Sequence, residues 1–174
     1  MSGIRKSKSM KLVSIAVIVA VGAFICATPL VVEATPPSGV SFSPVGRATL
    51  PPFSVVRKDK GVHWRVGLHA HQSIDVATQV VTFQPGGYSG WHTHPGPVFF
   101  TVRTGTLTVY EGDDPSCTPI TFTAGTGTVE AGTGTHIHMV RNETDSVAEA
   151  VVTYLVPIGA TLRTDLADPG NCPF

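Results

Sequence analysis

The stretch GGYSGWHTH, residues 86–94, is the most informative part of this sequence for the fold. In it, a glycine-rich turn leads into two histidines that are two residues apart. In an extended segment, side chains at positions i and i+2 point to the same face. His92 and His94 would therefore direct two imidazoles toward one point. Two such imidazoles can bind a metal ion if a third ligand comes from elsewhere in the chain.

A second stretch, GTHIHMVRN at residues 134–142, repeats this arrangement later in the chain. His136 and His138 form another same-face pair directly after a glycine turn. A lone histidine is more often a surface residue or a hydrogen-bonded core residue than a metal ligand. Two His-x-His pairs, each beside a glycine-rich turn, favour a metal site between two strands.

The rest of the chain after residue 76 predicts β-structure. Short runs of alternating β-branched and aromatic residues are separated by turns rich in Gly, Pro, Asp and Thr, and no stretch after the N-terminal segment keeps a helical period. The close spacing of the turns is typical of an antiparallel sandwich or barrel. The predicted strands are Val76–Phe83, Val98–Val102, Thr106–Tyr110, Ile120–Thr123, His136–Arg141 and Val147–Val156.

Together these residues resemble the cupin superfamily. The run from Gly86 through His92 and His94 to Gly105 is similar to its first motif, and residues 134–142 are similar to its second motif, which closes on Asn142. The resemblance covers residues 76–156. It implies an all-β fold of the cupin type, a double-stranded β-helix or jelly-roll barrel, with a metal near its mouth.

The resemblance implies His92, His94 and His138 as the metal ligands. His138 ranks above His136 because only His138 keeps the four-residue step to Asn142. His136 is the secondary candidate, either as a supporting group or as a fourth ligand. Compared with the second motif, this sequence has one extra residue between the glycine turn and His138. This residue loosens the alignment of His138 with the ligand position of the motif.

The glutamate that usually follows the second histidine of the first motif is missing, because residues 95–99 read PGPVF. In the motif register, position 98 faces the metal. Glu111 and Glu130 are the nearest carboxylates in sequence, and we interpret both as solvated residues at strand ends. Cupins of the thiol-dioxygenase type look similar, with three histidines only. Such a site keeps the full charge of the ion, which favours an anionic substrate or a bound hydroxide.

The N-terminal segment predicts export. Basic residues between Arg5 and Lys11 precede the apolar run Leu12–Ala27, which is typical of a secretory signal. We expect a signal peptide at residues 1–34, with cleavage after Ala34; an uncleaved anchor is the alternative. An irregular Pro/Ser-rich leader is expected at 35–60 and a single barrel domain with a C-terminal tail at 61–174. The protein would then be secreted or held in the cell envelope.

Removal of this segment leaves two cysteines, Cys117 and Cys172. An even number of cysteines in an exported chain favours a disulfide, which would join the tail to a loop. Two unpaired thiols are the alternative.

The composition restricts the classes of partner and function that we expect. Lys and Arg number 12, as do Asp and Glu, so the overall charge does not favour a nucleic acid or an acidic membrane as partner. Three hypotheses remain: a metal-dependent dioxygenase or related oxidoreductase, a barrel that binds a metal or small molecule without turnover, and a barrel without a metal. The ligands suit iron, manganese, copper, nickel or zinc. Arg103 and Arg141 are the cations nearest to the motifs in sequence, and the resemblance suggests a homodimer.

Overall fold

The computed structural model describes residues 33–61, 63–132 and 136–174, and all regular elements in these ranges are β-strands. Nearly all of the expected signal peptide, residues 1–32, lies outside the described residues. The predicted glycine turn at 132–134 is described only at Gly132. Among the residues that are described, no helix has the length and apolar character that a membrane crossing requires.

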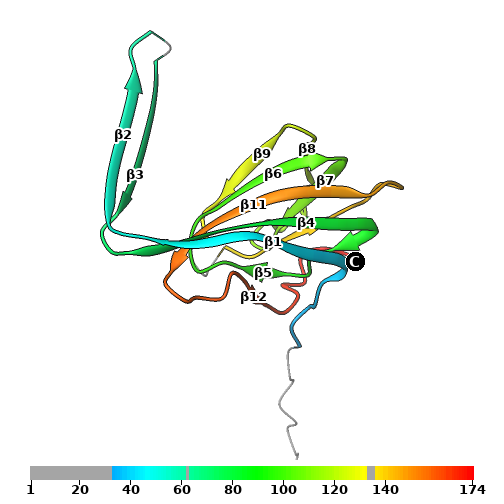
Figure 1. Cartoon of the computed structure of the whole chain (residues 1–174). Coiled ribbons are helices and arrows are strands. Elements are labelled where there is room, and N and C mark those ends of the chain that lie inside the picture. Colours follow the sequence, from blue (N-terminus) through cyan, green and yellow to red (C-terminus); the bar gives the residue numbers. More distant parts are fainter. Residues whose placement is uncertain (1–32, 62, 133–135) are drawn as a thin grey trace, which may run out of the picture. The chain divides into compact units, whose positions relative to one another are not determined.

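One face of the fold consists of five antiparallel strands. β4 lies between β1 and β11, and the order continues through β6 to β9. Figure 1 shows these long strands side by side. Their bounds are β1 Ser38–Leu50, β4 Ile74–Tyr88, β6 Val98–Thr104, β9 Gly127–Glu130 and β11 Ala148–Pro157.

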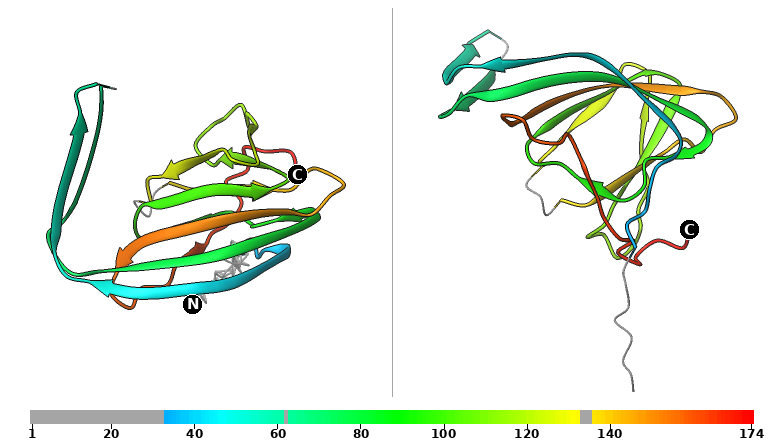
Figure 2. Two further views of the ribbon diagram at one scale, coloured as in Figure 1. Left: turned by 45° about the horizontal axis from the view of Figure 1, so that its top comes forward. Right: turned by 60° about the horizontal axis from the view of Figure 1, so that its bottom comes forward.

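The opposite face consists of shorter strands. β10 pairs with β5 on one side and with β7 on the other, while β12 and β8 extend these two sides. Arg141 of β10 also pairs with Tyr88 of β4, so the two faces join into a nearly closed antiparallel barrel (Figure 2). This confirms the predicted all-β double-stranded β-helix. The bounds are β5 His92–Thr93, β7 Thr106–Glu111, β8 Ile120–Thr123, β10 His138–Arg141 and β12 Thr164–Asp165.

The core fills the space between the faces. Along β11, and along β4 from Ile74 to Phe83, every second residue is buried, as the period-2 alternation predicts. Val98, Leu107 and Ala148 are completely inaccessible and belong to one apolar cluster that includes side chains from both faces. Tyr154 of this cluster lies beside His94, one of the histidines described below.

The prediction of an irregular leader at residues 35–60 is wrong. Residues 38–50 form β1, which pairs with β4 almost along its whole length, and β2 (Phe53–Asp59) pairs with β3 (Trp64–Ala70) in a separate two-stranded sheet. Proline is tolerated here because β1 pairs on one side only, and the strand register shifts between Pro44 and Gly46. Residues 51 and 52, both proline, separate β1 from β2.

Candidate metal centre

The structure brings His92, His94 and His138 together inside the barrel. His92 belongs to β5, His94 follows it directly, and His138 begins β10 opposite His92. One ligand nitrogen from each ring lies within 4.8 Å of the other two. All three residues are at most 5% exposed. The paired strands thus place three imidazoles around one point, which is the arrangement of ligands that a transition metal requires.

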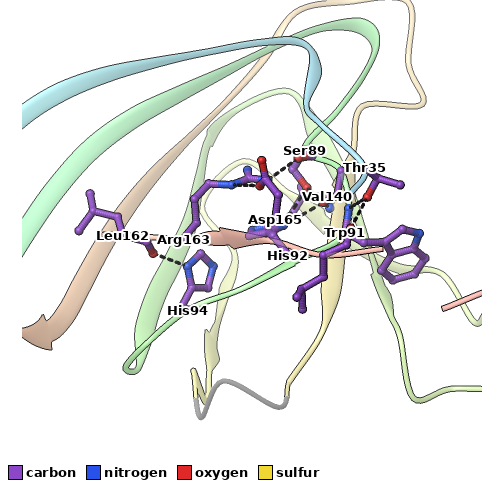
Figure 3. A network of polar contacts seen from close by, with 11 residues as sticks. Thr35, Ser89, Trp91, His92, His94, Val140, Leu162, Arg163 and Asp165 are labelled. Carbon is purple, nitrogen blue, oxygen red and sulfur yellow. Dashed lines mark hydrogen bonds and ion pairs between the residues drawn. The ribbon is translucent and has the colours of Figure 1, made fainter. Parts of the chain in front are cut away.

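Backbone carbonyls fix the orientation of two of these rings. His92 Nδ1 lies 2.9 Å from the carbonyl oxygen of Gly90, and His94 Nδ1 lies 2.7 Å from that of Leu162. A carbonyl oxygen can only accept, so each Nδ1 must carry the proton and donate it. In the neutral rings the lone pair is then on Nε2, as in metal-ligating histidines. Figure 3 shows both rings and the contact of His94 with Leu162.

The turn before His92 is held by a contact between distant parts of the chain. Thr35 Oγ1 accepts a hydrogen bond from the Trp91 amide at 2.7 Å and donates to the Leu166 carbonyl at 3.0 Å. Gly90 has φ of 71°, and a Cβ there would lie 2.0 Å from the Thr35 carbonyl oxygen. The glycine is therefore required both by its backbone conformation and by this close approach.

Arg163 is a cation near the histidines that the sequence motifs did not indicate. Its Nη2 donates to the Ser89 carbonyl at 2.8 Å, and its guanidinium also pairs with Asp165 (Figure 3). Burial lowers the pKa of His92 well below 6.5, and the charges of His138, Arg163 and His94 lower it further. Of the two cations considered from sequence, Arg103 pairs with Glu149 instead.

Glu130 at the end of β9 is buried, so the interpretation of this residue as a solvated strand end is wrong. Only 5% of it is exposed, and its Oε2 lies 3.3 Å from Nε2 of His94 and 3.3 Å from Nε2 of His138. Burial alone would raise the pKa of its carboxyl, but His138 and His94 outweigh burial and hold the pKa below its usual range. The signal that sequence reasoning missed is the antiparallel pairing of Val98 with Glu130.

His136, the secondary candidate, is not part of the three-histidine group. Its Nε2 lies 2.8 Å from Oε2 of Glu111, and its ring centroid is 5.3 Å from that of His138. Burial raises the pKa of Glu111, while the nearby His136 and His138 act in the opposite direction. The pair lies beside the site as a carboxylate–imidazole contact.

A small cavity of about 30 Å³ borders the histidines, with room for roughly two water molecules. Besides the polar groups it touches apolar side chains from both faces of the barrel. Tyr154 lies at its edge, 5.4 Å from His94 between ring centroids, and its hydroxyl accepts a hydrogen bond of 2.7 Å from Gln79. Burial raises the pKa of Tyr154 to about 12, so its hydroxyl stays protonated and can donate. Residues that line the cavity include Val81, Phe83, His92, His94, Phe100, Glu130, Val140, Val152, Tyr154 and Arg163.

The structure contains a disulfide between Cys117 and Cys172, with 5.2 Å between their Cα atoms. Cys172 is buried against Trp91 and Met139, so the tail packs under the turn that leads to His92.

The site fits a metal ion. His138 is 1% exposed, and neither of its ring nitrogens has a hydrogen bond among the described residues. A buried polar atom without a partner is costly, and an ion at the common point would satisfy Nε2 of this ring. Imidazole nitrogens also suit iron, copper, nickel and zinc, and an added carboxylate suits manganese.

Fold and site together define a double-stranded β-helix protein with a candidate metal centre inside its barrel. A family model described as the cupin domain matches residues 79–154, from β4 to β11. This match supports the cupin superfamily for the barrel part of the chain. No curated protein matches it with significance.

Solved structures with a similar fold include several cupins. The cupin domain of an XRE family transcriptional regulator from Enterobacter cloacae is 13% identical, with a TM-score of 0.42, over 68% of this chain and 97% of that one. A DMSP lyase from Ruegeria pomeroyi is 21% identical, with a TM-score of 0.42, over 51% and 42%. An oxalate oxidase in complex with glycolate is 26% identical, with a TM-score of 0.38, over 45% and 40%. The match spans less than half the length of the latter two proteins.

Proposed function

We propose that this protein is an exported cupin that holds one divalent transition metal on His92, His94 and His138 and acts as a small-molecule oxygenase-type enzyme. The observation that carries the proposal is the convergence of three buried imidazoles beside a cavity. Metal sites that only stabilise a fold are usually closed by four protein ligands, whereas catalytic sites keep a position open toward a substrate. The cavity provides the space for such a position.

The side chains around the cavity suit a small, polar or anionic ligand. Arg163 supplies a positive charge at the cavity wall, and the protonated hydroxyl of Tyr154 supplies a donor. The apolar walls exclude bulk water and so strengthen both interactions. A bound redox-active ion such as iron would supply Lewis acidity and electron transfer. Arg163 and Tyr154 would orient the ligand, and the guanidinium of Arg163 would balance a negative charge on it.

A non-catalytic barrel that binds a metal or a small ligand is the second candidate. It is favoured by the size of the cavity, because about 30 Å³ accommodates only a few atoms. A larger substrate would need the barrel mouth to open.

Metal content and oxygen consumption separate these candidates. The mature chain would be purified without a histidine tag, its metal measured by mass spectrometry, and oxygen uptake followed after loading with Fe(II) in the presence of small carboxylates and thiols. One equivalent of metal with substrate-dependent oxygen uptake supports the enzyme, and one equivalent without uptake supports the binder. A protein that binds no Fe, Mn, Cu, Ni or Zn contradicts both.

Export is supported by the basic and apolar N-terminal segment and by the disulfide, because such bonds persist in oxidising compartments. The mass of the protein recovered from its native host tests this part. A mature N-terminus near Thr35 is expected, and a full-length chain in the cytoplasm would contradict it.

A further inference from the structure

We propose that Glu130 of β9 is a fourth metal ligand, so that the centre is a three-histidine, one-carboxylate site whose carboxylate comes from a neighbouring strand. This inference rests on the proposed metal centre at His92, His94 and His138. It corrects the expectation of a centre built from imidazoles alone, and it changes the charge of the site and the class of ion that the site prefers.

The hydrogen bonds of His94 leave its Nε2 facing a second acceptor. Its Nδ1 donates to the Leu162 carbonyl, so Nε2 of the neutral ring carries a lone pair. The Glu130 carboxylate, which can also only accept, faces this nitrogen at 3.3 Å. Two acceptors at this distance in a buried site repel each other unless a cation or a proton lies between them. A metal ion at the common point would turn this repulsion into two coordinate bonds.

The spacing of the Glu130 oxygen from the two imidazoles also fits a shared ion. Glu130 Oε2 is 3.3 Å from Nε2 of both His94 and His138. With metal–ligand bonds of about 2.1 Å, neighbouring ligand atoms are about 3.0 Å apart in an octahedral site and about 3.4 Å apart in a tetrahedral site. Both distances lie between these limits. His138 Nε2 has no hydrogen bond within the described part of the chain, so the contact with Glu130 does not already satisfy it.

The register of β9 against β6 places Glu130 at this position. Glu130 lies directly opposite Val98 in the antiparallel pair of β9 and β6, and side chains of opposed residues share one face. Val98 is completely buried and occupies the position where the first motif would place its glutamate. Just beyond β9, a Cβ on Gly132 would lie 1.7 Å from the Gly96 carbonyl oxygen. This close approach of the two backbones holds the end of β9 beside the segment that follows His94.

A carboxylate ligand lowers the net charge of the centre by one relative to three neutral imidazoles. Mixed nitrogen and oxygen ligands suit Mn(II) or Fe(II), which accept six ligands, so four protein ligands still leave two positions facing the cavity. The inference therefore remains compatible with an open, reactive site. It disfavours Cu(I), which prefers sulfur ligands.

Glu130→Gln tests the inference, with Glu111→Gln as the matched control, because Glu111 also contacts a histidine but lies outside the three-histidine group. Binding of Mn(II) to the metal-free chain would be measured by calorimetry, and the absorption spectrum of the Co(II) form would be recorded. We expect Glu130→Gln to weaken Mn(II) binding roughly 100-fold or more and to change the Co(II) spectrum. Glu111→Gln should bind within about threefold of wild type.

The metal-free proteins distinguish a ligand from a structural ion pair. If Glu130 is a ligand, the metal-free Glu130→Gln chain should melt at the same temperature as wild type or higher, since the amide can donate to His94 and His138. If Glu130 only pairs with protonated histidines, the variant should melt lower. That result, or wild-type Mn(II) affinity in Glu130→Gln, would overturn the inference and leave the three-histidine centre intact. A wild-type chain that binds no metal would instead reject the proposed function, and this inference with it.

Two further variants, which move the carboxylate from Glu130 to the opposite residue of the strand pair, test the inference if Glu130→Gln folds poorly. Glu130→Val should lose Mn(II) binding, and the double variant Val98→Glu with Glu130→Val should regain it, because the carboxylate then comes from the opposite residue of the same strand pair. Failure of a folded double variant to bind better than Glu130→Val contradicts the inference.

Discussion

His138 lies directly opposite His92 in neighbouring antiparallel strands, and their ring centroids are 4.3 Å apart. Because the strand pairing itself brings these residues together, the site depends on the register of β5 and β10. A slip by one residue would turn His138 to the other face and separate the two rings. Two hydrogen bonds between the turn before β5 and β10 hold this register: the Ser89 amide donates to the Val140 carbonyl, and the Val140 amide donates to Ser89 Oγ.

Replacement of His92, His94 or His138 by Ala should abolish stoichiometric metal binding, because two remaining imidazoles do not surround an ion. His136→Ala should retain it, since that ring contacts Glu111. Metal content after gel filtration, with circular dichroism as the folding control, checks this set. Full metal content in any of the first three variants would contradict the assignment.

Metal binding should stabilise the fold and should weaken below about pH 6, where imidazoles with an ordinary pKa of about 6.5 take protons in competition with the ion. Burial, which is the main cause, lowers the pKa of His92, so this residue stays neutral to more acidic pH than a free imidazole. An ion at 100 times its dissociation constant adds about 2.7 kcal/mol of stability at neutral pH. Chelation should lower the melting temperature at pH 7.5 and have much less effect at pH 5. Equal effects at both pH values would argue against histidine ligands.

Loss of the Cys117–Cys172 disulfide should destabilise the protein by about 2–4 kcal/mol, because the bond constrains the unfolded chain over a sequence separation of 55 residues. Urea unfolding of Cys117→Ser measures the change. The double variant, with Ser at both positions, controls for an unpaired thiol. We expect both variants to fold, since the core cluster of the barrel does not contain either cysteine. An unchanged unfolding midpoint would show that the bond contributes nothing.

Asp75→Asn should destabilise the protein near pH 7. The carboxylate accepts hydrogen bonds from Thr49, from the Gly159 amide and from Arg47, which lower its pKa from 3.8 to about 2. Because the folded-state pKa is depressed, its stabilisation is present above pH 3.8 and is lost as the pH falls through about 2. The difference in melting temperature between wild type and variant should therefore shrink over this interval. A difference that does not depend on pH would rule out the charge as its source.

Gly90→Ala should destabilise the protein by about 2 kcal/mol or more and should displace His92, because the new Cβ meets the Thr35 carbonyl oxygen at a positive φ. Chemical denaturation and metal affinity should both be affected. Gly125→Ala is a suitable control: its φ is 84°, but no atom lies within 4 Å of the new Cβ. Equal losses in the two variants would assign the effect to backbone conformation alone.

The sequence predicted the parts of the site that depend on local spacing. His92 and His94 lie two residues apart beside a glycine turn, and the step from His138 to Asn142 placed His138 rather than His136 in the group that the structure brings together. Glu130 and Arg163 were not predicted, because they reach the site through strand pairing and a tail contact that no local pattern encodes. The edge strand β1 was missed because its proline, Pro44, is allowed only where one side of a strand stays unpaired.

The hydrogen bond from His94 to Leu162 has a consequence for the order of assembly. The ring is oriented by a carbonyl 68 residues further along the chain, near its end. In a nascent chain that has not yet been synthesised as far as Leu162, the carbonyl that fixes the tautomer of His94 is missing. High-affinity capture of the ion would therefore have to wait until the chain has been synthesised beyond Leu162. The identity of the bound metal would then be decided by the ions available in the compartment where the finished chain folds.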